Sequence, residues 1–233
     1  MKSSSDRPTR ILEAASRLIV HYGFDKTTMD DIAREAGVSK GSLYLAWPGK
    51  DQLFEALLAY QMRRLLDDLQ DRVERDPRGG RISSQYRHTV IALRNNPLMC
   101  ALYARDSRIL GDFVRRQDVE RYTRRMVIGA KGVQQMQAAG LLRSDIRPQV
   151  ITYLFSVIAL GFMSIGAIVL ESEAPGLEET GEALAAMMQS GLEAPGGDSA
   201  AGKQTFVEMI RFLKQQYSDG EAVQGGTDGS RHE

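Results

Sequence analysis

Polar and basic side chains gather between Thr27 and Lys50, in the stretch TTMDDIAREAGVSKGSLYLAWPGK. Lys40 and Lys50 can neutralise phosphates, and the hydroxyl groups of Ser42 and Tyr44 can donate hydrogen bonds. Helix N-termini in the same stretch would present free N–H groups, which bind phosphate oxygens. These residue types favour contact with a phosphate backbone and with base edges. The alternative is that they are solvated polar residues on a small helical bundle.

Local signals divide this stretch into short helices. Thr28, followed three residues later by Asp31, has the pattern of a capping box and predicts a helix that begins near Met29. The glycine of the following AGVS ends that helix, and Ser39 can cap a second one over residues 40–47. A Pro-Gly pair then starts a third helix. Two short helices joined by a tight turn are typical of a motif that places its second helix in the major groove of DNA.

The stretch from Ile11 to Phe54, ILEAASRLIVHYGFDKTTMDDIAREAGVSKGSLYLAWPGKDQLF, resembles the N-terminal DNA-binding domain of the TetR/AcrR family of bacterial transcriptional regulators. That family shows A-x-x-L-F-x-x-x-G-(F/Y)-x-x-T-T and then I-A-x-x-A-G-V-S-x-G-x-(L/I)-Y-x-(Y/H)-F-x-x-K. The chain matches this pattern in order and without gaps. It departs at Ala46, where Tyr or His is usual, and this puts one backbone contact in doubt. Trp47 replaces the usual Phe, a change within the core.

The resemblance implies a set of DNA-contacting residues: Thr28, Met29, Lys40, Gly41, Ser42, Tyr44, Leu45 and Lys50. The first two would lie against the DNA backbone, and the next three would lie nearest the base edges. Tyr44 and Lys50 would clamp the backbone. Leu45 would make an apolar contact, for instance with a thymine methyl group.

Helical periodicity continues beyond this region, and no strand pattern or internal repeat is evident, so the sequence predicts an all-α fold. Residues 1–52 would form a three-helix domain with a helix-turn-helix motif. A long fourth helix would join it to a helical regulatory, ligand-binding and dimerisation domain over residues 53–217, followed by a disordered tail at 218–233. The further helices are expected at about 84–94, after Asn96-Pro97, and at about 112–139, 150–170, 178–190 and 203–217.

The uncharged segment VITYLFSVIALGFMSIGAIVL, residues 150–170, is long enough to span a bilayer. Its serine, threonine and glycine residues dilute the apolar character, and helix stops bracket it as they would in a soluble protein. A helix that is apolar all round can also be buried on all sides. The family resemblance implies such a setting, because the corresponding helix packs against its own subunit and a partner. We therefore favour a buried helix and no membrane.

In the family, the larger domain dimerises and often binds a small molecule among its middle helices. The apolar and adaptable side chains that could line such a pocket are Met99, Tyr103, Phe113, Met126, Met136, Tyr153, Phe155 and Phe162. Such a lining would suit a bulky apolar effector. The alternative for each is ordinary core packing. The apolar helix and the helix near residues 178–190 would form a four-helix homodimer interface about a two-fold axis.

Composition excludes several classes of function. The 30 basic and 30 acidic residues balance, so the chain does not attract polyanions as a whole. Cys100 is the single cysteine and the three histidines are far apart, so we expect no disulfide, no metal site and no cofactor. No phosphate-binding glycine loop or nucleophile elbow is present. We therefore expect no enzyme, and the polar N-terminus without a signal-peptide pattern predicts a cytoplasmic protein.

These observations lead to one favoured hypothesis, a dimeric repressor that a small, apolar ligand releases from a palindromic operator in double-stranded DNA. A regulator that binds DNA without a ligand is one alternative. A membrane-anchored helical protein is the other.

Overall fold

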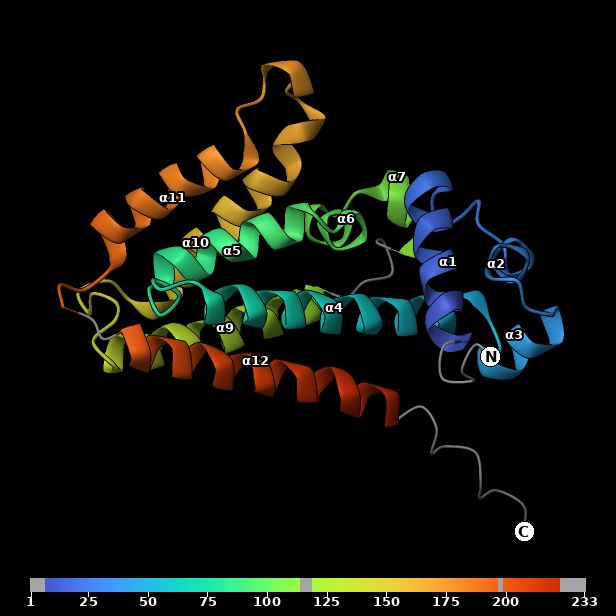
Figure 1. Cartoon of the computed structure of the whole chain (residues 1–233), viewed down its shortest axis with the longest axis horizontal. Coiled ribbons are helices and arrows are strands. Elements are labelled where there is room, and N and C mark those ends of the chain that lie inside the picture. The colour runs from blue at the N-terminus through green and yellow to red at the C-terminus, as the bar shows by residue number, and fades with distance from the viewer. Residues whose placement is uncertain (1–6, 114–118, 197–198, 223–233) are drawn as a thin grey trace, which may run out of the picture.

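The computed structural model describes residues 7–113, 119–196 and 199–222, with the backbone alone described at 119–128, 167, 171 and 217–222. The expected all-α class is confirmed. Figure 1 shows a small group of helices at one end, which we call the head, and a larger bundle, which we call the body. The head comprises α1 (Arg7–Tyr22), α2 (Met29–Ala36) and α3 (Lys40–Ala46). The body comprises α5 (Ile82–Arg94), α6 (Pro97–Ala104), α7 (Ser107–Leu110), α9 (Val119–Ala138), α10 (Pro148–Ser164), α11 (Leu177–Leu192) and α12 (Ser199–Ala222).

The helix ends in the head follow the local signals of the sequence. The Thr28 hydroxyl accepts a hydrogen bond from the Asp31 N–H at 3.2 Å, and the Asp31 carboxylate accepts one from the Thr28 N–H at 3.2 Å, which closes the expected capping box. Gly37 ends α2 in the left-handed conformation with φ of 65°. Ser39 then caps α3 by accepting a hydrogen bond from the Ser42 N–H at 3.2 Å.

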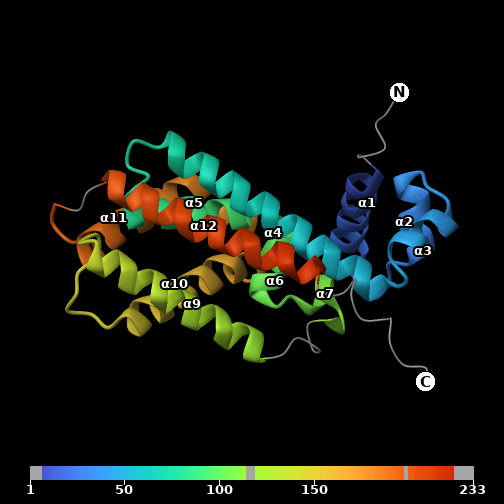
Figure 2. The same ribbon diagram turned by 90° about the horizontal axis from the view of Figure 1, so that it is seen from below.

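The long helix α4 (Lys50–Arg75) connects the head to the body, as expected. It begins beside α1 and ends at the DPRGG turn, and it packs against α1, α5 and α12 along its length. Figure 2 shows α12 lying along α4, and α9 beside α10. In the body, α11 packs mainly against α5. A movement of α4 would therefore be felt both in the head and across the body.

Several expected helix boundaries differ from the structure. The helix expected over residues 112–139 is described from Val119 to Ala138, and residues 114–118 lie outside the described residues. The apolar helix ends at Ser164 and tightens into a 3-10 turn, η2 (Ile165–Ala167), where glycine and serine weaken helix propensity. A second 3-10 turn, η3 (Glu171–Glu173), follows.

Helix α12 ends at Ala222, so residues 218–222 of the expected disordered tail are helical and residues 223–233 lie outside the described residues. Helix α10, which was expected to be buried on all sides, leaves apolar side chains exposed on one face of the single chain. Within the described ranges, no helix is both long and apolar enough to cross a bilayer.

The core of the head extends into the body. Ile19, Ile32, Leu43 and Phe54 are fully buried in one cluster with the body residues Leu98, Ala101, Leu110 and Phe113. A second buried cluster joins α4, α5, α6, α10, α11 and α12, and a third lies around Val133, Met136 and Ile151. The head therefore shares its hydrophobic core with α6 and α7, and the sequence boundary at residue 52 does not separate two independent cores.

Candidate nucleic-acid interface

Helix α3 presents one face to the core and the opposite face to solvent. Leu43 is fully buried and anchors α3 on the head, whereas Lys40 and Gly41 are exposed. On the outer face, Tyr44 is 47% exposed and Leu45 is 90% exposed. Figure 1 shows α2 and α3 at the end of the molecule furthest from the body bundle. A short helix that projects polar, aromatic and apolar side chains from one end of the molecule has the geometry of a helix that enters the major groove.

The expected contacts at the start of α2 are divided between surface and core. Thr28 is exposed, but its hydroxyl group is engaged in the capping box. The Met29 side chain is buried in the head core, so at this position only the main chain could reach a DNA backbone. Hydrogen bonds from the Thr28 side chain and main chain lower the pKa of Asp31 below its usual value, so this carboxylate keeps its negative charge beside the helix N-terminus.

Lys40, the first residue of α3, forms an ion pair with Asp30 of α2. Two more exposed ion pairs lie on the same head, between Arg34 and Asp31 and between Arg17 and Glu35. The side-chain hydroxyl of Ser42 accepts a hydrogen bond from the Ser39 hydroxyl at 2.9 Å. The polar groups expected nearest the bases are therefore partnered within the protein.

Lys50 has a structural role that the sequence did not indicate. Its ammonium group donates hydrogen bonds to the main-chain oxygens of Phe24 at 2.9 Å and Thr27 at 3.1 Å, with that of Asp25 at 3.5 Å. It also lies 4.3 Å from the centre of the Phe24 ring. An ammonium group has three donors, so these contacts occupy Lys50 in holding the α1–α2 loop against the start of α4. The expected clamp on DNA would need one of these bonds to be exchanged for a phosphate.

The α1–α2 loop also contacts the body directly. The Phe24 N–H donates to the Ile109 carbonyl at 2.8 Å, and the Asp25 carboxylate accepts from the Asp112 N–H at 3.3 Å. Gly23 has φ of 88°, and a Cβ there would lie 2.7 Å from the Arg108 carbonyl oxygen. The loop is therefore seated on the α7 turn as well as on α4.

Aromatic and polar side chains strengthen this junction. The ring of Phe54 lies 4.7 Å from that of Phe24 and 4.6 Å from that of Phe113, centre to centre. About two turns further along α4, the Gln61 amide donates to the Ser16 hydroxyl at 3.2 Å and accepts from the Asn96 amide at 3.0 Å. Asn96 caps α6, so this chain of hydrogen bonds runs from α1 through α4 to the start of α6.

The residues expected to line a ligand pocket do not form one group. Met99 is fully buried in the second cluster, and Tyr103, Phe155 and Phe162 are partly buried against it. The others lie apart: Phe113 in the head cluster, Met136 in the third cluster, and Tyr153 on the outer face of α10 with 63% exposure, whereas the Met126 side chain lies outside the described residues. Four of the eight expected residues therefore share one region, between α4, α5, α6 and α10.

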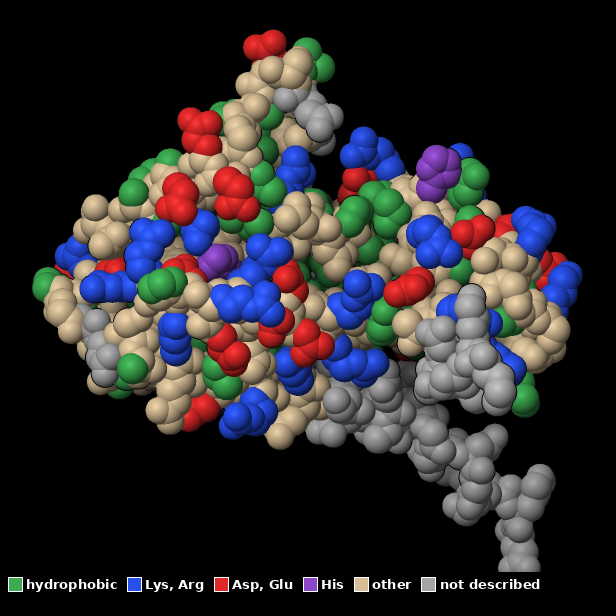
Figure 3. Space-filling model, in the orientation of Figure 1, with side chains coloured by type: hydrophobic (Ala, Val, Ile, Leu, Met, Phe, Trp, Pro, Cys, Tyr) green, Lys and Arg blue, Asp and Glu red, His purple; other side chains and the backbone are tan. Residues whose placement is uncertain are grey.

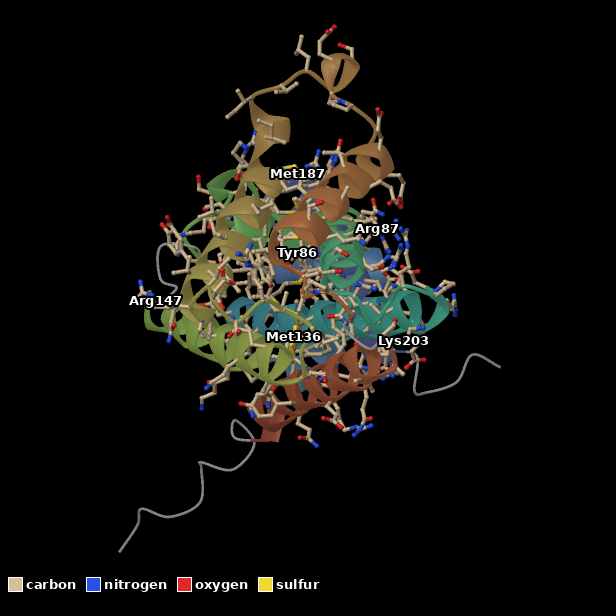
Figure 4. All side chains as sticks on the ribbon, turned by 90° about the vertical axis from the view of Figure 1, so that its left-hand side faces the viewer. Tyr86, Arg87, Met136, Arg147, Met187 and Lys203 are labelled. Carbon is tan, nitrogen blue, oxygen red and sulfur yellow. The ribbon has the colours of Figure 1, made fainter. Side chains whose placement is uncertain are left out.

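Tyr86 belongs to this region but was not expected. Its hydroxyl donates a hydrogen bond to the Phe155 carbonyl, and the two rings lie 4.9 Å apart. Burial raises its pKa well above the usual value, and the nearby Tyr103 raises it further, so Tyr86 stays neutral. Figure 4, which looks along the body, shows Tyr86 inside the bundle of helices. The polar residues Ser83, Ser84 and Gln85 precede Tyr86, so the local sequence did not indicate that this tyrosine faces the interior.

Apolar side chains remain exposed on the outer face of α10 and on the segment that follows it. These are Val150, Tyr153, Leu154, Val157, Leu160, Ile165, Ile168 and Leu170, and Met187 is exposed on α11. The first five recur at helical spacing and form one stripe on α10. Helix α11 adds exposed small residues, including Ala183, Ala186 and Gly191. An apolar stripe of this length is typical of a surface that another protein covers.

Comparisons with known proteins agree with this description. Residues 11–57 match the family model "Bacterial regulatory proteins, tetR family". An uncharacterised HTH-type transcriptional regulator of Mycobacterium bovis is 35% identical over 65 residues, which are 28% of this chain and 34% of that protein. The HTH-type transcriptional regulator SrpR of Pseudomonas putida is 39% identical over 56 residues, 24% of this chain and 26% of that protein. The chain thus matches about a third or less of the length of these relatives.

Solved structures extend the similarity to the body. A TetR-family regulator from Mesorhizobium loti has a TM-score of 0.59 at 19% identity, over 83% of this chain and 100% of that one. AibR in complex with isovaleryl coenzyme A and operator DNA has a TM-score of 0.55 at 21% identity, over 78% of this chain and 97% of that one. At these identities the likeness concerns the fold alone. Residues 11–57, which cover most of the head and the start of α4, therefore match the tetR family of bacterial regulatory proteins.

Proposed function

We propose that this protein is a dimeric DNA-binding transcriptional regulator of the cytoplasm, which represses from a palindromic operator and is released by a small, apolar ligand. The observation that carries DNA binding is the exposed outer face of α3, where Lys40, Tyr44 and Leu45 project beyond a buried Leu43. The family consists of regulators rather than enzymes, in agreement with the expectation from the sequence.

The proposed dimer is formed by α10 and α11. The stripe on α10 and the small residues of α11 are exposed in the single chain, and burying them against the same faces of a second chain would complete a four-helix interface. Gly161 and Gly191 leave room for a second helix to approach closely, because no other atom of the chain lies within 4 Å of a Cβ added at either position. Two heads related by a two-fold axis would meet successive major grooves about 34–36 Å apart on one face of DNA.

The proposed effector site lies around Met99, Tyr103, Phe155 and Phe162. These side chains are apolar or amphipathic, and Tyr86 adds a buried hydroxyl beside them. The position suits control of DNA binding, because Met99 is on α6, whose N-cap residue Asn96 is hydrogen-bonded through Gln61 to α1. A ligand that inserts into this cluster would displace α6 and α4. It can shift the equilibrium between the DNA-binding conformation and the released conformation only as far as its affinities for these two conformations differ. The complex of AibR with a coenzyme A thioester and operator DNA supports this scheme by analogy of fold.

A regulator that binds DNA without a ligand is the alternative, and the tight packing of Met99 favours it, because that side chain has no exposure at all. The two schemes differ in one measurement. If the regulator depends on a ligand, at least one compound from a library of apolar acids, alcohols and acyl thioesters should change its affinity for the operator. If it does not depend on a ligand, no compound should.

The experiment that tests the proposal is selection of bound sequences from a random duplex DNA pool with the purified full chain. Enrichment of a palindrome with half-sites about one helical turn apart is expected. The matched control is the variant Lys40→Ala with Leu45→Ala, which removes two outward-facing side chains of α3 while leaving Leu43 in the core. No enrichment by a folded dimer at low salt would refute the proposed function.

A further inference from the structure

We propose that Asp30 is an internal counterion of Lys40, which competes with DNA for this lysine and thereby lowers both the affinity of the head and the salt dependence of binding. This inference rests on the proposed DNA-binding function and concerns a residue that neither the sequence nor the family pattern singled out. The competing carboxylate lies in the first turn of α2, and the lysine is the first residue of α3.

The geometry places the ion pair on the surface expected to meet DNA. The ammonium group of Lys40 contacts the Asp30 carboxylate across the turn between the two helices. Both side chains are accessible, with 65% of the Lys40 side chain and 49% of the Asp30 side chain exposed. Lys40 precedes the exposed Gly41 at the N-terminus of α3, so a DNA groove that accepts α3 also approaches this pair. Contact between Lys40 and a phosphate or a base therefore requires the lysine to leave Asp30.

Two other basic residues of the head are also paired with carboxylates. Arg34 pairs with Asp31, which also closes the capping box of α2. Arg17 of α1 pairs with Glu35. Figure 3 shows acidic and basic side chains interspersed over the face in view, without a large patch of one sign. On this face the head therefore presents no large positive patch that would by itself hold DNA, so the charge state and pairing of an individual lysine affect binding.

Two consequences follow from this competition. The first is a lower affinity, because each head must break an exposed ion pair when it binds, a cost that corresponds to about a two- to five-fold loss of binding. The second is a weaker salt dependence. A lysine that neutralises a phosphate releases cations from DNA, with a slope of about −0.9 per phosphate. When the freed Asp30 carboxylate remains beside the DNA, it retains a cation, so the net release is smaller.

The test compares Asp30→Asn with the wild-type full chain on the selected operator and on an unrelated duplex of the same length. We expect tighter binding to both duplexes, by about two- to five-fold per head. We also expect a plot of log affinity against log salt that is steeper by up to about 0.9 per head. Glu35→Gln is the matched control, since it makes the same charge change in α2 but frees Arg17 on α1. This control should leave the slope closer to that of wild type.

A double-mutant cycle with Lys40→Ala identifies the route of the effect. If Asp30 acts through Lys40, the gain from Asp30→Asn disappears in the Lys40→Ala background. A gain that persists there would overturn the proposal, because Asp30 would then act directly on DNA. Weaker binding by Asp30→Asn would also overturn it, since the ion pair would then position Lys40 for contact.

Stability is measured alongside, because Asp30 lies in the first turn of α2 and favours the helix dipole. Asp30→Ser offers a second neutral side chain if the asparagine variant melts early, and it should give the same affinity change. An unchanged affinity and slope in folded variants of a DNA-binding wild type would overturn the role of Asp30 alone. A wild-type chain that binds neither duplex at low salt would overturn the proposed function, and the assignment of Asp30 with it.

Discussion

The ammonium group of Lys50 lies 2.9 Å from the main-chain oxygen of Phe24 and 4.3 Å from the centre of its ring. This contact joins the first residue of α4 to the loop between α1 and α2. The same loop donates a hydrogen bond from Phe24 to Ile109 of the body. Lys50 therefore fixes the junction at which the head, the long connecting helix and α7 meet.

Replacing Lys50 by alanine should destabilise the protein by about 2 kcal/mol, because three carbonyl oxygens of the loop lose a charged donor. DNA binding should weaken for every sequence alike, as the orientation of the head becomes less defined. Thermal unfolding and binding to two unrelated duplexes measure the two effects. Lys26→Ala, at an exposed position of the same loop, is the control and should leave stability near wild type. A stable Lys50→Ala protein that has lost DNA binding would assign the lysine to phosphate contact instead.

Substitution of Tyr44 and substitution of the residues at the start of α3 should affect the DNA sequence preference differently. Tyr44→Phe removes one exposed hydroxyl and should weaken binding to all DNA sequences by about 1 kcal/mol. Lys40→Ala or Ser42→Ala should alter the preferred bases, with changes of about 1–3 kcal/mol at particular positions. Binding to a panel of operators with single base-pair changes separates the two. If all three substitutions had equal effects on every operator, the assignment of Tyr44 to the DNA backbone and of Lys40 and Ser42 to the base edges would be wrong.

Gly23 and Gly41 should respond oppositely to substitution by alanine. Gly23→Ala should destabilise the protein by about 1–3 kcal/mol, because φ is 88° and the new Cβ would lie 2.7 Å from the Arg108 carbonyl oxygen. Gly41→Ala has open space around it and should raise stability by up to about 1 kcal/mol through helix propensity. If α3 enters a groove, Gly41→Ala should also weaken DNA binding. Thermal melting and operator binding test both, and a Gly23→Ala protein as stable as wild type would argue against the tight contact with α7.

His88 should make the protein less stable as the pH falls below its ordinary pKa of 6.5. Burial lowers the pKa of His88 in the folded state, although its hydrogen bond to Asp76 at 3.0 Å opposes this. The unfolded chain then binds a proton more readily than the folded one, so the free energy of unfolding decreases with falling pH until the folded imidazole is also protonated. Urea unfolding at pH 7.5, 6.5 and 5.5 measures this slope. His88→Gln should flatten it, and an unchanged slope in that variant would assign the loss of stability to other groups.

The apolar stripe on α10 should be required for dimerisation. Leu154→Glu together with Val157→Lys would place charges on the outer face of α10, where both side chains are exposed in the single chain. We expect a monomer with near-normal thermal stability and a large loss of operator affinity, because two half-sites are no longer bound together. Sedimentation and melting measure these properties. Gln134→Glu with Gln135→Lys, at exposed positions of α9, is the control. A variant that stays dimeric would place the interface elsewhere.

The sequence by itself determined the elements whose signals are local. The capping box of Thr28 and Asp31, the left-handed Gly37 and the cap Ser39 each act within four residues, so their chemistry can be read without the fold. The residue pattern also predicted which face of α3 is exposed. Leu43 was expected in the core and Tyr44 and Leu45 on the outer face, as the structure has them.

The tertiary structure decided the roles that depend on residues far apart in the chain. Lys50 looks like any solvated lysine until the α1–α2 loop is seated on it, and Met29 looks available until it enters the head core. Tyr153 and Phe155 stand two residues apart, yet one faces outward and the other lies against Tyr86. A helix that is apolar on nearly every side carries no periodic signal to separate core from surface, so only the packing of its neighbours assigns each face.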